Sequence, residues 1–150
     1  YHEDIHGRPF YPEAPAGRVL RRVLEDEGVA PCRITNLVRC RPPDNKLAPW
    51  PDAVAACSAW LDMEIRDAHP KVVVALGAMP ASRWFGSLPA HEVATLARAV
   101  PADDDRALPP LIVVGAFHPA YIARGSDPGA EESLRASVRR AKDLVSEVRR

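Results

Sequence analysis

The sequence lacks a long apolar run, a surplus of charge of either sign and enough cysteines for a disulfide framework. Nowhere do about 18 apolar residues follow one another, which excludes a membrane-spanning helix. The 20 Lys+Arg balance 20 Asp+Glu, so the basic charge of many nucleic-acid-binding domains is missing, although this does not exclude a local basic patch. Three cysteines are too few for a disulfide framework and odd in number, which favours a reducing, cytoplasmic location.

What is present fits one small globular domain. The chain has 150 residues, of which 47% are hydrophobic, and this suits a single folded unit over residues 1–150. It begins at Tyr1 with neither a methionine nor the charged and apolar regions of a signal peptide. We therefore expect a domain that is incomplete at its N-terminus rather than a secreted protein.

Short apolar runs alternate with helical patterns, which indicates an α/β fold with a parallel sheet and right-handed crossovers. Strands are predicted at residues 32–38, 71–76 and 111–116, and the last two are continuous apolar runs typical of strands covered on both faces. Residues 89–110 are predicted to be rich in loops. Helices are predicted at residues 17–27, 51–68, 78–86 and 131–148, where apolar residues recur at helical intervals.

Polar side chains follow two of the predicted strands. Asn36 lies at the end of the first, and His118 follows the third, directly before Pro119. Ligands of such sheets bind at the carboxyl ends of the strands. The Asn36 amide offers a donor and an acceptor to the edge of a nucleobase, and a neutral His118 imidazole can stabilise an anionic leaving group. Taken singly, each residue type at such a position is more often structural.

Further candidates lie near the N-terminus and among the cysteines. Phe10 follows a turn and can offer a stacking platform for a base, although a core position is the default for phenylalanine. Glu3 can supply acid–base or electrostatic help, although an acid near a chain end is usually solvated. Cys40 and Cys57 show no Cys-x-x-Cys spacing, so a self-contained zinc site is poorly supported and two buried thiols are the alternative.

The order and spacing of these residues carry more information than any one of them. Together they resemble the family 4 uracil-DNA glycosylases, with the family 5 enzymes as near neighbours, over roughly residues 3–124. The stretch at residues 35–46, with Thr-Asn, then Arg-Cys-Arg-Pro-Pro and Asn-Lys, is highly specific, and His-Pro-Ala at residues 118–120 strengthens the match. The other matching stretches are Glu-Asp at 3–4, Gly-x-Pro-Phe at 7–10, Cys57 with Trp60 and Leu61, and Val-Val-Ala-Leu-Gly at 73–77.

The resemblance implies a three-layer α/β/α fold with a short four-stranded parallel sheet, whose first strand would precede Tyr1. It also implies an enzyme that removes uracil from DNA. In that family pattern Phe10 stacks on the flipped uracil, Asn36 reads the edge of the base and His118 contacts its O2 oxygen.

The resemblance also implies features that would lie partly upstream of Tyr1. A water-positioning Gly-Glu-x-Pro-Gly motif would directly precede the first residues, and we expect Glu3 beside it to take a catalytic role. The implied cofactor is a 4Fe–4S cluster with Cys40 and Cys57 as two of its four ligands and an upstream cysteine pair as the others. Cys32 matches no ligand of the family.

Contacts to DNA are expected around the same two loops. Tyr121 or Ile122, just after the His-Pro pair, would fill the gap that an extruded base leaves in the duplex. Cationic side chains near the loops can contact phosphates, although two of them, Arg41 and Lys46, can equally be ordinary solvated charges. The candidate phosphate contacts are Arg39, Arg41, Lys46 and Arg124.

The leading hypothesis is therefore a uracil-DNA glycosylase domain of base excision repair that acts as a monomer on uracil-containing DNA. No membrane is expected as a partner. Two alternatives stay open. One is a non-catalytic uracil- or DNA-binding module of the same fold that lacks the hydrolytic motif, and the other is a structural α/β fragment whose function lies in partner residues outside this chain.

Overall fold

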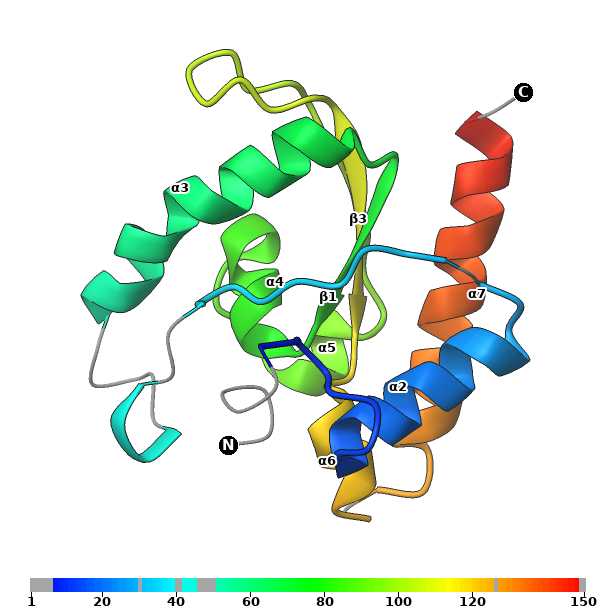
Figure 1. The fold of residues 1–150 in the computed structure, drawn as a ribbon. Coiled ribbons are helices and arrows are strands. Elements are labelled where there is room, and N and C mark those ends of the chain that lie inside the picture. Colours follow the sequence, from blue (N-terminus) through cyan, green and yellow to red (C-terminus); the bar gives the residue numbers. More distant parts are fainter. Residues whose placement is uncertain (1–6, 30, 40–41, 46–50, 126, 149–150) are drawn as a thin grey trace.

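Helices and strands alternate along the chain, as the computed structural model shows for residues 7–29, 31–39, 42–45, 51–125 and 127–148 (Figure 1). The predicted bounds of the second helix are confirmed, and those of the other three predicted helices are confirmed to within two residues. The strands are β1 Val72–Leu76, β2 Ala97–Val100 and β3 Leu111–Ala116. The helices are α2 Pro15–Asp26, α3 Pro51–Ala68, α4 Ala78–Phe85, α5 Ala90–Val93, α6 Pro119–Ala123 and α7 Ala130–Val148, with a 3₁₀ helix at Pro43–Asn45.

The sheet has the strand order β1-β3-β2, so β3 is its central strand. The strands β1 and β3 are parallel, with Val72 opposite Ile112 and Leu76 opposite Ala116. Because β3 is paired on both edges and covered on both faces, it is buried along most of its length. Both apolar runs predicted to be parallel strands are confirmed, and so is the α/β class.

The prediction of the sheet was wrong in two details. Residues 32–38 are not part of a strand, whereas residues 97–100, predicted within a loop-rich stretch, form β2. In addition β2 is antiparallel to β3, so the three-stranded sheet of the described residues is mixed rather than parallel, and the fourth strand is not shown. The physical reason is that a strand needs a neighbour for its backbone groups, and β-branched residues alone do not provide one.

Helices cover both faces of the sheet, and the expected three layers are confirmed (Figure 1). Adjacent residues of β1 separate the two sides: Val73 packs in one core cluster and Val74 in the other, as alternation along a strand requires. One cluster joins α3, α4 and α5 to the sheet through Leu61, Ile65, Ala75, Ala81, Val93, Leu111 and Val113. The other joins α2 and α7 to it through Val19, Val23, Ala116, Leu134 and Val138.

A buried carboxylate ties α3 to its neighbours near the amino end of β3. Asp62 of α3 is only 8% exposed and forms an ion pair with Arg83 of α4. It also accepts hydrogen bonds from Arg106 in the β2–β3 loop, at 3.0 Å from Nε and 2.8 Å from Nη2. Burial lowers the pKa of the Arg83 guanidinium, and the charge of Asp62 acts in the opposite direction.

None of the helices among the described residues combines the length and the apolar character that crossing a bilayer requires.

Candidate active site

The carboxyl ends of the two parallel strands bring Gly77 and His118 together. Gly77 follows β1 and donates its backbone N–H to the carbonyl of Ala116, the last residue of β3, at 2.8 Å. Its φ of +95° lies in a region that side-chain-bearing residues rarely adopt. A Cβ at this position would lie 3.1 Å from the Cβ of His118. Glycine therefore lets the turn after β1 pack directly against the histidine.

The imidazole of His118 is held in one tautomer by the start of α6. His118 is the N-cap residue of that helix, and its Nδ1 accepts a hydrogen bond from the backbone N–H of Ala120 at 3.1 Å. A neutral imidazole whose Nδ1 is an acceptor carries its proton on Nε2. The short helix thus prepares an Nε2–H donor at the carboxyl end of the sheet.

The ring of Phe10 lies beside this imidazole. The two ring centroids are 5.4 Å apart and the planes are inclined by 36°. Phe10 is buried and has a positive φ of 49°, which is uncommon for a residue with a side chain. An aromatic ring and a histidine from distant parts of the sequence therefore meet.

A glycine in α2 allows the backbone around Phe10 to take this course. A Cβ on Gly17 would lie 1.8 Å from the carbonyl oxygen of Tyr11 and 2.8 Å from that of Phe10. The same carbonyl of Tyr11 accepts a hydrogen bond from the N–H of Ala14 at 3.0 Å, directly before the helix begins. The absence of a side chain at residue 17 thus permits the close approach of the turn to the helix.

Asn36 lies half-buried in an extended segment, residues 31–39, that crosses the molecule beside β1 and α4 (Figure 1). Its neighbour Leu37 packs against the core cluster that includes Ala75 of β1 and Ala81 of α4. Among the described residues, no hydrogen bond or ring contact joins Asn36 to Phe10 or His118. The proposed reading of a base edge by Asn36 therefore stays a prediction.

The residues predicted to contact DNA lie in different settings. Tyr121 and Ile122 belong to α6, where the Tyr121 ring stacks on Phe117 with centroids 5.6 Å apart and Ile122 packs against a core cluster. The wedge role of either residue stays a prediction. Arg124 is exposed at the end of α6, and Arg39 is exposed but forms an ion pair with Glu64.

Four predicted site residues lie outside the described residues. They are the catalytic candidate Glu3, the cluster ligand Cys40 and the phosphate contacts Arg41 and Lys46. Their roles stay predictions.

The described residues do not fit a four-cysteine metal site on their own. Cys57 is half-buried on α3, and Cys32 is exposed in the segment that carries Asn36. Within the described ranges no group of three or more His, Cys, Asp or Glu side chains is placed to hold a metal ion. The full sequence has three cysteines, one fewer than such a cluster needs.

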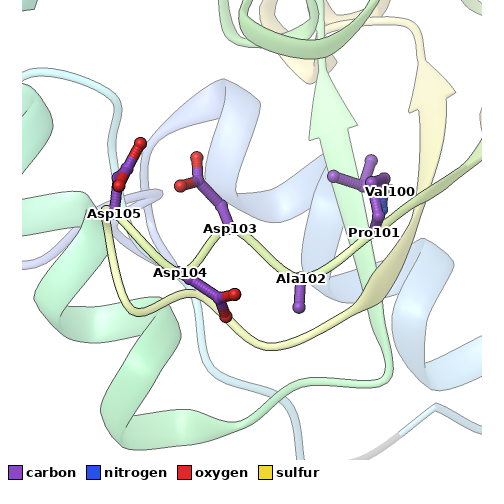
Figure 2. Close-up of a pocket in the computed structure, with 6 residues that line it drawn as sticks. All are labelled: Val100, Pro101, Ala102, Asp103, Asp104 and Asp105. Carbon is purple, nitrogen blue, oxygen red and sulfur yellow. The ribbon is translucent and has the colours of Figure 1, made fainter.

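Two surface hollows lie at the other end of the sheet, around the loop that precedes β3. One, of about 490 Å³, is lined by residues 100–105, and Figure 2 shows its three aspartates on a single turn of the backbone. The other, of about 220 Å³, is lined partly by Arg83, Arg98 and Arg106. Both hollows lie near the amino end of β3, whereas His118 follows its carboxyl end. The length of the strands therefore separates the hollows from His118.

Gly17 and Gly77 are the residues of this site whose roles sequence reasoning missed. The position of Gly77, directly after a buried apolar run, was a signal for a special turn, since glycine is common where a strand turns into a helix. Gly17 offered no such signal, because glycine inside a helix usually only weakens it.

Comparisons with known proteins identify the family of this chain. Residues 1–142 match the model of the uracil DNA glycosylase superfamily. The chain therefore belongs to the uracil-DNA glycosylase superfamily.

Three similar proteins within that superfamily are type-4 enzymes. A type-4 uracil-DNA glycosylase of Thermotoga maritima is 32% identical over 145 residues, which are 95% of this chain and 71% of that protein. A type-4 enzyme of Saccharolobus solfataricus is 38% identical over 89 residues, 55% of this chain and 38% of its own length. Another, of Sulfurisphaera tokodaii, is 42% identical over 81 residues, 50% of this chain and 34% of its own. These relatives confirm the resemblance to the type-4 family.

Proposed function

We propose that this domain hydrolyses the N-glycosidic bond of uracil in DNA, as the first step of base excision repair. Family membership supports the reaction class, and one observation carries the chemistry. That observation is the pairing of the Phe10 ring with a His118 imidazole whose Nδ1 is already occupied by the N–H of Ala120.

The reaction needs a donor where negative charge develops. When the bond between C1′ of the deoxyribose and N1 of uracil breaks, its electron pair passes into the uracil ring and onto its oxygens. The Nε2–H of His118 can donate a hydrogen bond to the O2 oxygen, stabilising the anion without transferring a proton. Because the tautomer is preset, no reorganisation of the imidazole is required during bond breaking.

The remaining groups bind and orient the base. A base inside a duplex is out of reach, so the uracil must be extruded into the site, where the Phe10 ring offers a stacking surface. The Asn36 amide provides the donor and acceptor that a uracil edge requires. Water supplies the oxygen that bonds to C1′ and, overall, the proton that uracil gains, leaving an abasic sugar.

We propose that Glu3 assists the water, that Arg39, Arg41, Lys46 and Arg124 contact phosphates, and that the domain acts as a monomer. Of these residues only Arg39 and Arg124 lie in the described part of the chain, and both are exposed.

A uracil-containing single-stranded oligonucleotide tests the proposal. The expected result is uracil release that leaves an alkali-labile site, and His118→Ala should lower the rate by about 100- to 1000-fold, the usual cost of removing a preorganised donor. His91→Ala, which changes an exposed histidine of α5, is the matched control and should retain the rate. Retention of the oligonucleotide without release would indicate the non-catalytic binding module instead.

The iron–sulfur cofactor is a separate proposal. We propose that Cys40 and Cys57 are ligands of a 4Fe–4S cluster. In the purified protein that carries the cluster, Cys57→Ala should abolish its visible absorbance and Cys32→Ala should not. Persistence of the absorbance in Cys57→Ala would remove this residue from the ligand set.

A further inference from the structure

The segment that carries Asn36 is held by side chains rather than by the sheet. Residues 31–39 belong to no strand, and among the described residues no backbone–backbone hydrogen bond of this segment is found. A segment without such bonds is free to shift unless its side chains anchor it. The position of the Asn36 amide therefore depends on the anchors nearest to it in the sequence.

Two anchors follow Asn36 closely. Leu37 packs against the core cluster built around α3, α4 and the sheet. Arg39 forms an ion pair with Glu64 of α3, and its guanidinium lies 5.1 Å from the centroid of the Trp60 ring, one turn earlier on the same helix. We call the three residues Arg39, Glu64 and Trp60 the Arg39 clasp.

Two residues of the clasp have a degree of burial that is unusual for their type. Trp60 is 51% exposed, although a tryptophan of a helix usually buries its ring. The Glu64 side chain is 21% exposed, and its Oε2 oxygen is buried without a hydrogen-bond partner among the described groups. A half-buried carboxylate facing one arginine is a costly arrangement that fixes the direction of that arginine.

We propose that Glu64 is a positioning residue for uracil recognition: through Arg39, it sets where the Asn36 amide meets the base. This inference rests on the proposed function. Hydrogen-bond recognition of a base edge is sensitive to displacements well below 1 Å, so a loose anchor three residues from the amide weakens the contact in the transition state. The Arg39 side chain is 47% exposed, so water screens its charge and loss of the ion pair costs little stability; the effect on the rate should therefore exceed that on folding.

This role of Arg39 differs from a phosphate contact, and the salt dependence of DNA binding distinguishes the two roles. Loss of one phosphate contact weakens DNA binding at all sequences and reduces the slope of log affinity against log salt by about 1. Loss of positioning lowers kcat and leaves that slope unchanged. Glu64 is an acid, so its removal cannot subtract a phosphate contact directly.

The test is a double-mutant cycle with Glu64→Gln and Asn36→Ala on a uracil-containing oligonucleotide. Glu64→Gln alone should lower kcat about tenfold, while the salt slope of KM stays as in the wild type. In the Asn36→Ala background the same substitution should have no further effect, because the group that it positions is gone. Glu132→Gln, which breaks the exposed ion pair with Arg139 on α7, is the matched control and should keep the wild-type kcat.

NMR relaxation gives a readout that does not depend on activity. Glu64→Gln should lower the backbone ¹⁵N order parameters of residues 33–39 and leave those of β3 unchanged. An unaltered kcat, a tenfold loss that persists in the Asn36→Ala background, or a reduced salt slope would each overturn the inference. If the wild-type chain releases no uracil, the proposed function fails, and unaltered order parameters of residues 33–39 in Glu64→Gln would then overturn the clasp separately.

Discussion

A Cβ on Gly77 would lie 3.1 Å from the Cβ of His118, so the turn after β1 and the candidate donor are in direct contact. The N–H of Gly77 is also bound to the carbonyl of Ala116, two residues before the histidine. The end of one parallel strand therefore sets the position of the side chain that follows the other.

The first prediction is that Gly77→Ala lowers uracil release by about tenfold or more, because the new methyl group pushes the histidine from its place. The backbone strain at φ +95° should also cost about 1–3 kcal/mol of unfolding free energy. Both quantities are measured on the purified variant, by oligonucleotide cleavage and by urea denaturation.

Gly86 offers a control for the strain alone. It flanks the other end of α4 with similar dihedral angles, φ 79° and ψ −174°, and a Cβ there would meet nothing within 4 Å. Gly86→Ala should lose comparable stability and keep the rate of the folded enzyme. Equal losses of activity in the two variants would show that the contact with His118 is unimportant.

The second prediction concerns Gly17 and the stacking ring. Gly17→Ala places a Cβ where the carbonyl of Tyr11 now lies, so the turn that carries Phe10 must move. We expect a loss of about 1–3 kcal/mol from overpacking, partly offset by the better helix propensity of alanine, and a raised KM for uracil-DNA.

The control for this prediction is Gly129→Ala, before α7. A Cβ there would lie 3.4 Å from Oδ1 of Asp127, which is an ordinary contact. This variant should keep the wild-type KM. If Gly17→Ala also kept it, the close approach of the turn to α2 would not be what positions Phe10.

The elements with strong local patterns could be predicted, whereas those made by pairing could not. The helical spacing in α3 and α7 and the apolar runs of β1 and β3 suffice to locate them. Residues 97–100 carry two alanines and an exposed arginine, and they form β2 only because an edge of β3 is available. Residues 32–38 have the better strand composition but no strand partner among the described residues.

The residues of the candidate site also fall into some that could be predicted from the sequence and others that could not. His118 and Asn36 could be selected because they follow predicted strands, and the resemblance added Phe10. The contact of Gly17 with the Phe10 turn and the ion pair of Glu64 with Arg39 join residues remote in sequence. Such contacts arise from packing, which no periodicity of a single segment encodes.

The third prediction is spectroscopic. Because Nδ1 of His118 accepts the N–H of Ala120, ¹⁵N NMR of the neutral imidazole should show the Nε2–H tautomer. The exposed His91 of α5, in fast exchange with water, provides a reference for a mixed population. A protonated Nδ1 in the neutral ring would contradict the assignment of Nε2–H as the donor.

The last prediction separates stability from catalysis. Asp62→Asn removes the carboxylate that Arg83 and Arg106 share. Arg106 keeps its ion pair with Asp103, but the Arg83 side chain is only 11% exposed and would lose its ion-pair partner. Breaking a buried ion pair in this way costs about 3–5 kcal/mol. The cluster lies beside the β2–β3 loop, at the end of the sheet opposite to His118, so the folded fraction should keep its kcat.

The control is Asp105→Asn, in the same loop but exposed, which should change neither the stability nor kcat. A lowered kcat in Asp62→Asn under conditions where it is fully folded would show that the two ends of the sheet are coupled.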